Sequence, residues 1–418
     1  MACSNLVVKL FGNENSLSKY LINKVAFNPP ASDTYSVKTS HNNIISHSTL
    51  SNFKDVFFSS YGGCVEKVDF ISKNYPLIST YCPFISTQAY LVSKRDIQSH
   101  ICIIYLKNAN STKNISSNKI IYSHGSSSDI GDNLPFLYNL CTLLKCDVVS
   151  YDYSGFGCSS GSPSEETINS DLKQVINFCI EDLHFDIQDI ILFGYSIGSV
   201  CTVNMSINHK FHQIAGVALL SPLVYGLNTY FVDTKEKNNI LIRSNELNTN
   251  FYRISRINQP ILLIHGKMDE LVPFIQVNQM VRQIKNVFQW FPSGGNHLNI
   301  PSQYRTKFFT KFQAFIERIN ASKNTLSIRE SKNKIIDKEI NIGKKIETIK
   351  NYINKEDNIN SQDTSIRMFV NDEGENETEV TGIPSSQIAS MGNNNYYGSI
   401  KKTKYDVMFN LKFGKNTD

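Results

Sequence analysis

The chain has 418 residues, of which 41% are hydrophobic and 19% are charged. This composition fits a protein that is globular over most of its length, and it excludes collagen-like chains, coiled coils and charged disordered polymers. The 42 basic and 37 acidic residues leave a net charge of only +5, which gives no reason to expect a nucleic-acid partner.

Cysteine usage and the N-terminal sequence bear on where the protein works. The nine cysteines are scattered, with no Cys-x-x-Cys pair and no histidine at metal-ligand spacing. Residues 1–20 do not read as a signal peptide, and no run of 18 apolar residues occurs. We expect an intracellular protein without a transmembrane helix or a bound metal, either cytoplasmic or peripherally associated with the cytosolic face of a membrane.

Short apolar segments and amphipathic helical segments alternate along the central part of the chain. Two strands, at 64–70 and 101–106, are expected to begin a sheet in antiparallel order. The following strands are predicted at 119–123, 147–151, 190–193, 217–220, 261–264 and 287–291. The helices between them are predicted at 133–144, 164–183, 197–208, 273–284 and 303–319. This alternation predicts an α/β fold with a mostly parallel sheet flanked by helices.

The composition divides the chain into three parts. Residues 51–320 carry the predicted strands and helices and form one domain, preceded by an N-terminal extension at 1–50. Residues 321–418 are rich in Asn, Lys, Glu, Ser and Thr and hold no apolar segment that could build a core, so we expect a low-complexity, disordered tail. A series of isoleucines between 335 and 349 has the spacing of a short amphipathic helix.

The pentapeptide GYSIG at 194–198 lies between a predicted strand and a predicted helix. This is the context of a nucleophile elbow, in which a sharp turn exposes a serine hydroxyl at the C-terminal edge of a sheet. Gly194 and Gly198 lack side chains and so permit the turn. The pattern alone is weak evidence, but its position between strand and helix makes Ser196 the candidate nucleophile.

A serine nucleophile needs a base and an acid that holds the base. Asp269 follows a predicted strand, and His297 lies in the loop after the next strand. The order serine, acid, histidine is the one found in α/β hydrolases. Alternatives remain at this point: Glu270 as the acid, Asp269 as the cap of the following helix, and His265 as the base.

The oxyanion of an acyl-transfer reaction needs two backbone N–H donors. The predicted donors are Ile197, directly after the nucleophile, and Ser126, in the loop after the strand at 119–123. His124 is expected to orient that loop rather than to transfer protons. The glycines at 155, 157 and 161 have the wrong spacing for a nucleotide site, so we interpret them as a tight turn beside the active site.

Several motifs resemble the α/β-hydrolase domain-containing protein 17 family. The motifs are KVAFNPP (24–30), TYS (34–36), SYDYSGFG (150–157), SSGSPSE (159–165), GYSIG (194–198) and SPL (221–223). The resemblance covers about residues 20–320. It implies an α/β-hydrolase fold and a serine hydrolase that removes palmitate from cysteine thioesters on membrane-associated proteins. It also implies Ser196, Asp269 and His297 as the triad, with no cofactor.

The sequence departs from this family in two places. The family begins with a cluster of cysteines that are acylated and hold the enzyme at membranes, whereas only Cys3 lies near this N-terminus. One acyl chain gives only marginal binding, so membrane contact would need a second element such as the mildly amphipathic stretch at 6–25. Ser126 stands where the family has asparagine, which matters little for a backbone donor.

The leading hypothesis is a serine hydrolase that cleaves S-acylated protein or lipid ester substrates through an acyl-enzyme. About 40 residues separate Ser221 from Pro260, which leaves room for a small cap and an open site. The alternatives are a monoacylglycerol-type lipase, a carboxylesterase, a serine peptidase and a catalytically silent binding protein with the same fold.

Overall fold

The computed structural model describes residues 23–24, 26–40, 42–46, 65–93, 99–109, 118–225, 250–356, 369–370 and 376–377. The chain divides into two units, Met1–Ser327 and Ile328–Asp418, which are taken separately below. Cys3, most of the stretch at 6–25 and the cap segment at 226–249 lie outside the described residues.

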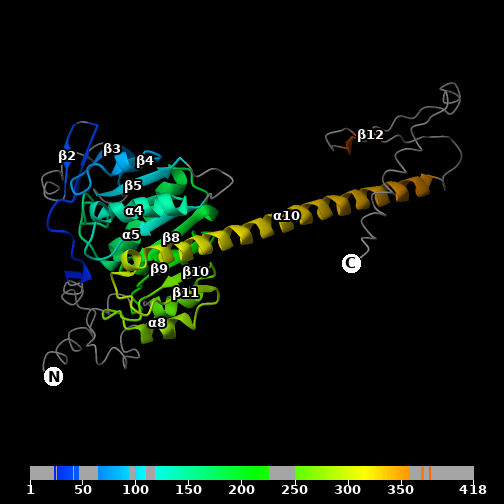
Figure 1. The fold of residues 1–418 in the computed structure, drawn as a ribbon. Helices are drawn as coiled ribbons and strands as arrows, with labels where there is room; N and C mark the ends of the chain where they lie inside the picture. Colours follow the sequence, from blue (N-terminus) through cyan, green and yellow to red (C-terminus); the bar gives the residue numbers. More distant parts are fainter. Residues whose placement is uncertain are drawn as a thin grey trace. The chain divides into compact units, whose positions relative to one another are not determined.

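A single sheet forms the centre of the first unit (Figure 1). Among the described residues it has eleven strands in the order β11-β10-β9-β8-β6-β7-β5-β4-β3-β1-β2. Their bounds are β1 (Tyr35–Lys38), β2 (Ile44–Ile45), β3 (Val65–Ser72), β4 (Ile85–Ser93), β5 (His100–Asn108), β6 (Lys119–Ser123), β7 (Asp147–Tyr151), β8 (Ile190–Tyr195), β9 (Gly216–Leu220), β10 (Ile261–Ile264) and β11 (Val287–Trp290). Strands β6 to β11 are parallel. Strands β1 to β5 pair antiparallel and join the parallel part where β5 meets β7.

Helices cover both faces of the sheet. Their bounds are α3 (Ile78–Tyr81), α4 (Ile130–Leu144), α5 (Glu165–Glu181), α6 (Gly198–Ser206), α7 (Asn250–Arg253), α8 (Phe274–Val281), α9 (Ile300–Gln303) and α10 (Arg305–Glu356), with short 3₁₀ helices η2 (Ile187–Asp189) and η5 (Ile254–Arg256). Apolar residues of α5, α6 and α8 pack in the core on one face, and those of α4 and the start of α10 pack on the other. The first unit is therefore a three-layer α/β structure, as the alternating sequence pattern predicts.

Successive side chains of β8 point alternately into the two hydrophobic cores on either side of the sheet. Ile190 and Leu192 belong to the core beneath α5, α6 and α8, whereas Ile191 and Phe193 belong to the core beneath α4 and α10. Both faces are buried, so the strand reads as a continuous apolar run in the sequence. The strand ends at Tyr195, directly before Ser196, which places the candidate nucleophile at the C-terminal edge of the parallel sheet.

The sheet reaches further toward the N-terminus than the predicted domain boundary at residue 51. β1 and β2 lie within residues 1–50, and β1 pairs with β3 from Tyr35 opposite Ser72 to Lys38 opposite Asp69. Tyr35 and Val37 are buried in the core. β4 was also not predicted, because its first half carries Ser86, Thr87 and Gln88 and so lacks an apolar run.

The last helix also differs from the prediction, which ended it at residue 319. Six residues from Phe308 to Ile319 are buried, and this buried face ends where the predicted helix ends. The helix nevertheless continues to Glu356, through the first part of the predicted tail. Residues 321–356 hold no proline and are rich in lysine and glutamate, which favour helix. In the second unit, β12 (Phe369–Val370) and β13 (Asn376–Glu377) form an antiparallel pair.

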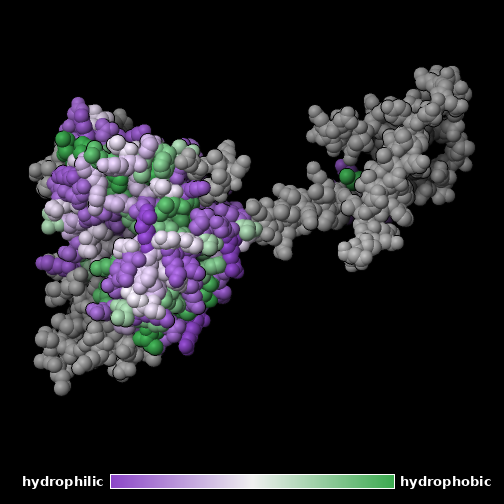
Figure 2. Space-filling model, in the orientation of Figure 1, coloured by the Kyte–Doolittle hydropathy of each residue, from purple (hydrophilic) through white to green (hydrophobic). Residues whose placement is uncertain are grey.

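The surface of the described residues is mixed in character. On the face shown in Figure 2, hydrophilic residues alternate with small hydrophobic groups. Within the part of the chain that the structure describes, no helix is both long and apolar enough to cross a bilayer.

Candidate active site

Ser196 lies on the turn between β8 and α6. Its backbone φ is +53°, in the left-handed region that a residue with a Cβ rarely adopts. The Ser196 N–H donates to the Leu220 carbonyl on the neighbouring strand at 3.0 Å, which fixes the turn. Such a strained strand-to-helix turn presents a serine hydroxyl at the edge of the sheet.

The two glycines of the motif allow close approach of neighbouring backbone. A Cβ on Gly194 would lie 2.6 Å from the Gly198 carbonyl oxygen and from the Thr202 Oγ1. A Cβ on Gly198 would lie 2.2 Å from the Ser123 carbonyl oxygen, at the end of β6. The glycines therefore permit α6 to begin directly against the two central strands.

His297 approaches Ser196 from the loop between β11 and α9. The Ser196 Oγ lies 2.8 Å from the His297 Nε2, within hydrogen-bond distance. The His297 carbonyl accepts two hydrogen bonds of 3.2 Å, from the Tyr195 hydroxyl and from the Ser221 Oγ. These two hydroxyls hold the backbone of the histidine loop next to the nucleophile.

Asp269 lies on the other side of the imidazole. Its Oδ2 is 2.8 Å from the His297 Nδ1, and its side chain is fully buried. Its Oδ1 accepts the backbone N–H groups of Leu271 and Val272 at 3.0 and 2.8 Å. Asp269 therefore holds the histidine and closes the turn before α8, but it is not the cap of that helix, because the N-cap position is Pro273. The structure brings Asp269, not Glu270, to the Nδ1 of His297.

The aspartate loop and the histidine loop are joined by backbone contacts. The N–H of Met268 donates to the Gly295 carbonyl at 2.8 Å, and the N–H of Lys267 donates to the Pro292 carbonyl at 3.1 Å. A Cβ on Gly266 would lie 2.2 Å from the Gly295 oxygen, so the two loops touch there. These contacts fix the distance between Asp269 and His297.

His265, the alternative base, is fully buried behind Asp269. Its Nε2 lies 2.9 Å from the Val272 carbonyl and 3.4 Å from the Asp269 Oδ2. Burial lowers the pKa of His265, although the Asp269 carboxylate acts in the opposite direction. His265 therefore supports the aspartate loop, and His297 is the histidine beside Ser196.

The two predicted oxyanion donors lie in the loop after β6 and at the start of α6. Ser126 lines the same cavity as Ser196 and His297, and Ile197 directly follows the nucleophile. Within the described part of the chain, neither the Ser126 N–H nor the Ile197 N–H donates an intramolecular hydrogen bond. Unpaired N–H groups at the first turn of a helix and in an adjoining loop are suited to binding a developing negative charge.

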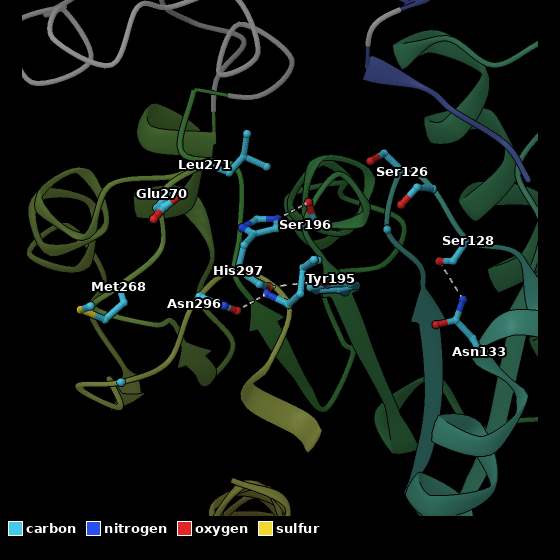
Figure 3. Close-up of a pocket in the computed structure, with 14 residues that line it drawn as sticks. Ser126, Ser128, Asn133, Tyr195, Ser196, Met268, Glu270, Leu271, Asn296 and His297 are labelled. Atoms are coloured by element: carbon cyan, nitrogen blue, oxygen red, sulfur yellow. Dashed lines mark hydrogen bonds between the residues drawn. The ribbon is translucent and has the colours of Figure 1, made fainter. Parts of the chain in front are cut away.

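A cavity of about 800 Å³ opens over these residues (Figure 3). Ser126, Ser128 and Asn133 line one side of it, and Met268 and Glu270 line the other, with Ser196 and His297 between them. A second cavity of about 460 Å³ shares Asn133, Tyr195 and Leu298 with the first. The site is a wide cleft at the C-terminal ends of the parallel strands.

Tyr195 and Ser221 hold the histidine loop in place, and the sequence does not indicate this role for either residue. Tyr195 is part of the GYSIG motif, but the pattern gives no role to its side chain. Ser221 belongs to the SPL motif, which likewise gives no role to its side chain. Ser221 also has a positive φ of +46°, which no sequence pattern here predicts.

The glycine-rich segment after β7 forms a tight turn, as predicted. Gly155, Gly157 and Gly161 all have positive φ, at +83°, +46° and +98°. A Cβ on Gly157 would lie 1.9 Å from the Asp152 Oδ2 and 2.7 Å from the Tyr35 hydroxyl. Gly157 therefore makes room for the buried side chains of Asp152 and Tyr35.

Comparisons with known proteins agree with this architecture. The model of the α/β-hydrolase-fold family matches residues 123–243. α/β-Hydrolase domain-containing protein 17C of Xenopus tropicalis is 32% identical over 188 residues, which cover 44% of this chain and 58% of that protein. The human protein 17B is 33% identical over 155 residues, which cover 37% of this chain and 51% of that protein.

The chain spans little more than half the length of the curated relatives that it matches. An esterase from Pyrococcus furiosus is 16% identical, with a TM-score of 0.46 and coverage of 57% of this chain and 92% of that one. The sheet topology and the family match show an α/β-hydrolase fold, and the chain is similar in sequence to members of the α/β-hydrolase domain-containing protein 17 family.

Proposed function

We propose that the protein is a serine hydrolase that removes acyl groups from S-acylated cysteines of proteins. The observation that carries the proposal is the continuous chain from the Ser196 Oγ to the His297 Nε2 and from the His297 Nδ1 to the Asp269 Oδ2, with both distances 2.8 Å. This arrangement has the geometry of a Ser-His-Asp triad.

The reaction proceeds in two steps in this mechanism. The Ser196 Oγ attacks the thioester carbonyl while its proton passes to the His297 Nε2, and Asp269 stabilises the imidazolium that forms. The N–H groups of Ser126 and Ile197 bind the oxyanion. The cysteine thiolate leaves and takes the proton from His297. Water, activated by His297, then releases the fatty acid and restores Ser196.

The shape of the cleft supports a large acylated substrate. Two apolar side chains at its rim, Met268 and Leu298, are 63% and 72% exposed. The adjoining cavity extends the surface beyond Tyr195. An open cleft with apolar side chains at its edge suits a fatty acyl chain attached to a protein, and the family resemblance supports palmitate as that chain. Such a substrate lies at a membrane surface, where we expect the protein to meet it.

Turnover of matched substrates tests this proposal. Purified protein is given an S-palmitoyl peptide and the same peptide with an O-palmitoyl ester, with Ser196→Ala as the blank. Ser206→Ala is a matched control, because Ser206 is also a buried serine, lies at the end of α6 and donates to the Thr202 carbonyl. Serine-dependent preference for the thioester is expected. Preference for the O-palmitoyl ester would instead indicate a lipase or a carboxylesterase.

A serine-directed fluorophosphonate distinguishes an enzyme from a silent binding protein with this fold. The wild type and Ser206→Ala should both be labelled, and Ser196→Ala should not. Absence of labelling on the folded wild type, or equal labelling of Ser196→Ala, would contradict a triad-based function.

A further inference from the structure

The orientation of the Gly125–Ser126 peptide decides whether the Ser126 N–H can serve as an oxyanion donor. The Gly125 carbonyl of this peptide lies 2.8 Å from the His124 Nδ1. In a trans peptide the C=O and the N–H point in opposite directions. A carbonyl held by the buried His124 therefore turns the Ser126 N–H toward the cavity that Ser126 lines.

His124 is fully buried and tightly enclosed. Its ring lies 4.1 Å from the ring of Tyr153 and 5.3 Å from that of Phe156, centroid to centroid, and its carbonyl accepts the Tyr153 hydroxyl at 2.7 Å. Burial lowers the pKa of His124 to about 4, so the ring is neutral at pH 7. One nitrogen then carries the hydrogen, and because the Gly125 carbonyl only accepts, that nitrogen is Nδ1.

Asp152 faces the other nitrogen of this ring. The His124 Nε2 lies 3.5 Å from the Asp152 Oδ1, which also accepts the Ile130 N–H at 2.9 Å. The Asp152 Oδ2 accepts the Tyr35 hydroxyl. Burial and the nearby Asp129 carboxylate raise the pKa of Asp152. The His124 Nε2 makes no hydrogen bond within the described residues, and the Asp152 carboxyl group faces it at 3.5 Å.

The N-terminal segment reaches the loop at 124–130 at two points and Asp152 at a third. The Asn28 N–H donates to the Ser126 carbonyl at 2.9 Å, and the Thr34 hydroxyl donates to the Asp129 carboxylate at 2.6 Å. The Tyr35 hydroxyl donates to Asp152, and the Tyr35 oxygen accepts the N–H of Cys158 at 3.0 Å. The segment therefore holds this loop both directly and through Asp152, which accepts the Ile130 N–H.

We propose that Tyr35, Asp152 and His124 form a positioning chain that fixes the Gly125–Ser126 peptide as an oxyanion donor. β1 then contributes to catalysis as well as to the sheet. The inference rests on the proposed function, because it assigns Ser126 to the oxyanion of that reaction. The three residues are positioning residues, since they act on the reacting atoms only through the peptide.

Tyr35→Phe and Tyr105→Phe make a matched pair that tests the chain. Each variant deletes one tyrosine hydroxyl that bonds a buried aspartate, Asp152 for Tyr35 and Asp147 at 2.9 Å for Tyr105. Asp147 is the first residue of β7, at the opposite edge of the parallel strands from Ser196. Both variants should lose stability, but only Tyr35→Phe should lower kcat, by about tenfold, with KM nearly unchanged, because oxyanion binding acts in the transition state.

The rate of fluorophosphonate labelling of Ser196 is measured on the same variants and should fall in parallel with kcat. This readout does not depend on the thioester, so failure of the substrate assignment and failure of the positioning chain give different results. Equal kcat and equal labelling rates for Tyr35→Phe and Tyr105→Phe would overturn the proposal.

A second pair keeps the test decisive if Tyr35→Phe does not fold. His124→Asn retains a side-chain N–H that can reach the Gly125 carbonyl, whereas His124→Leu retains the bulk without the donor. Asparagine should restore a large part of kcat relative to leucine. Equal kcat and labelling rates for the two folded variants would contradict the proposed role of His124.

Discussion

Ser196 depends on the absence of a side chain at Gly198. A Cβ there would meet the carbonyl carbon of Ser123 at 2.7 Å and the carbonyl oxygen of His124 at 2.8 Å, in addition to the Ser123 oxygen. Those atoms belong to the end of β6 and to the start of the loop that follows it. One methyl group would therefore push the turn at Ser196 and this loop apart.

We expect Gly198→Ala to lower the free energy of unfolding by about 1–3 kcal/mol, as for overpacked cores, and to lower kcat strongly. Gly343→Ala is the matched control, because nothing lies within 4 Å of a Cβ at that position. The control should leave turnover unchanged. Chemical denaturation and steady-state kinetics measure both effects, and wild-type kcat in Gly198→Ala would contradict this account of the turn.

We expect the free energy of unfolding to depend on pH through His265. Its pKa in the folded protein is lowered by burial from 6.5, so below pH 6.5 the unfolded chain binds more protons there than the folded protein does. The free energy of unfolding should therefore fall as the pH falls through this range. His265→Gln, which keeps a donor for the Val272 carbonyl, should show a smaller loss between about pH 7 and pH 5 in urea titrations. Equal losses of stability in the wild type and in His265→Gln would contradict this contribution of His265.

The candidate triad could be selected at the residue scale because the chemistry of a triad is tied to local patterns. Ser196 lies between two glycines, and Asp269 and His297 each follow a strand, so chain order and strand ends were enough to select them. Tyr195 and Ser221 could not be assigned, because their contacts with the His297 carbonyl form only when the loops meet. The choice between Asp269 and Glu270 likewise needed the loop geometry.

At the scale of elements, the parallel strands were the easiest to predict. Each is buried on both faces and so appears as an apolar run, as in β8 and β10. β1 and β2 are short, and each becomes part of the sheet only by pairing, β1 with β3 and β2 with β1. α10 was predicted too short because its apolar face ends at Ile319, whereas backbone propensity carries the helix on to Glu356.

The position of β1 predicts that residues 26–46 are required for a stable fold. A chain that begins at residue 51 loses β1 and β2, and with them Tyr35 and Val37, which are buried. We expect this chain to be insoluble or unfolded by circular dichroism and size-exclusion chromatography. A chain that begins at residue 23 keeps both strands and should fold. A folded, active chain from residue 51 would contradict the place given to β1.

For the whole molecule, the boundary at Ser327 predicts which part of the C-terminal sequence the hydrolase unit needs. Phe308, Phe312 and Phe315 are fully buried in the core on one face of the sheet, and no side chain beyond Ile319 that the structure describes is part of this core. A chain that ends at residue 327 should keep wild-type kcat and a similar thermal midpoint.

A chain that ends at residue 304 loses these phenylalanines, and each buried aromatic side chain typically contributes several kcal/mol. We expect that chain to be unfolded. If the chain that ends at residue 327 folds but has lost turnover, the C-terminal part has a catalytic role that this account does not include.

In the proposed mechanism Ser196 carries the acyl group during turnover, and this acyl-enzyme can be trapped. Protein is mixed with an S-palmitoyl peptide, quenched in acid within the first turnover and digested for mass spectrometry, with Ser196→Ala treated in parallel. We expect one palmitoyl group on the wild-type peptide that contains Ser196 and none on that peptide from the variant. An acyl group on another residue, or release of palmitate by Ser196→Ala at the wild-type rate, would contradict it.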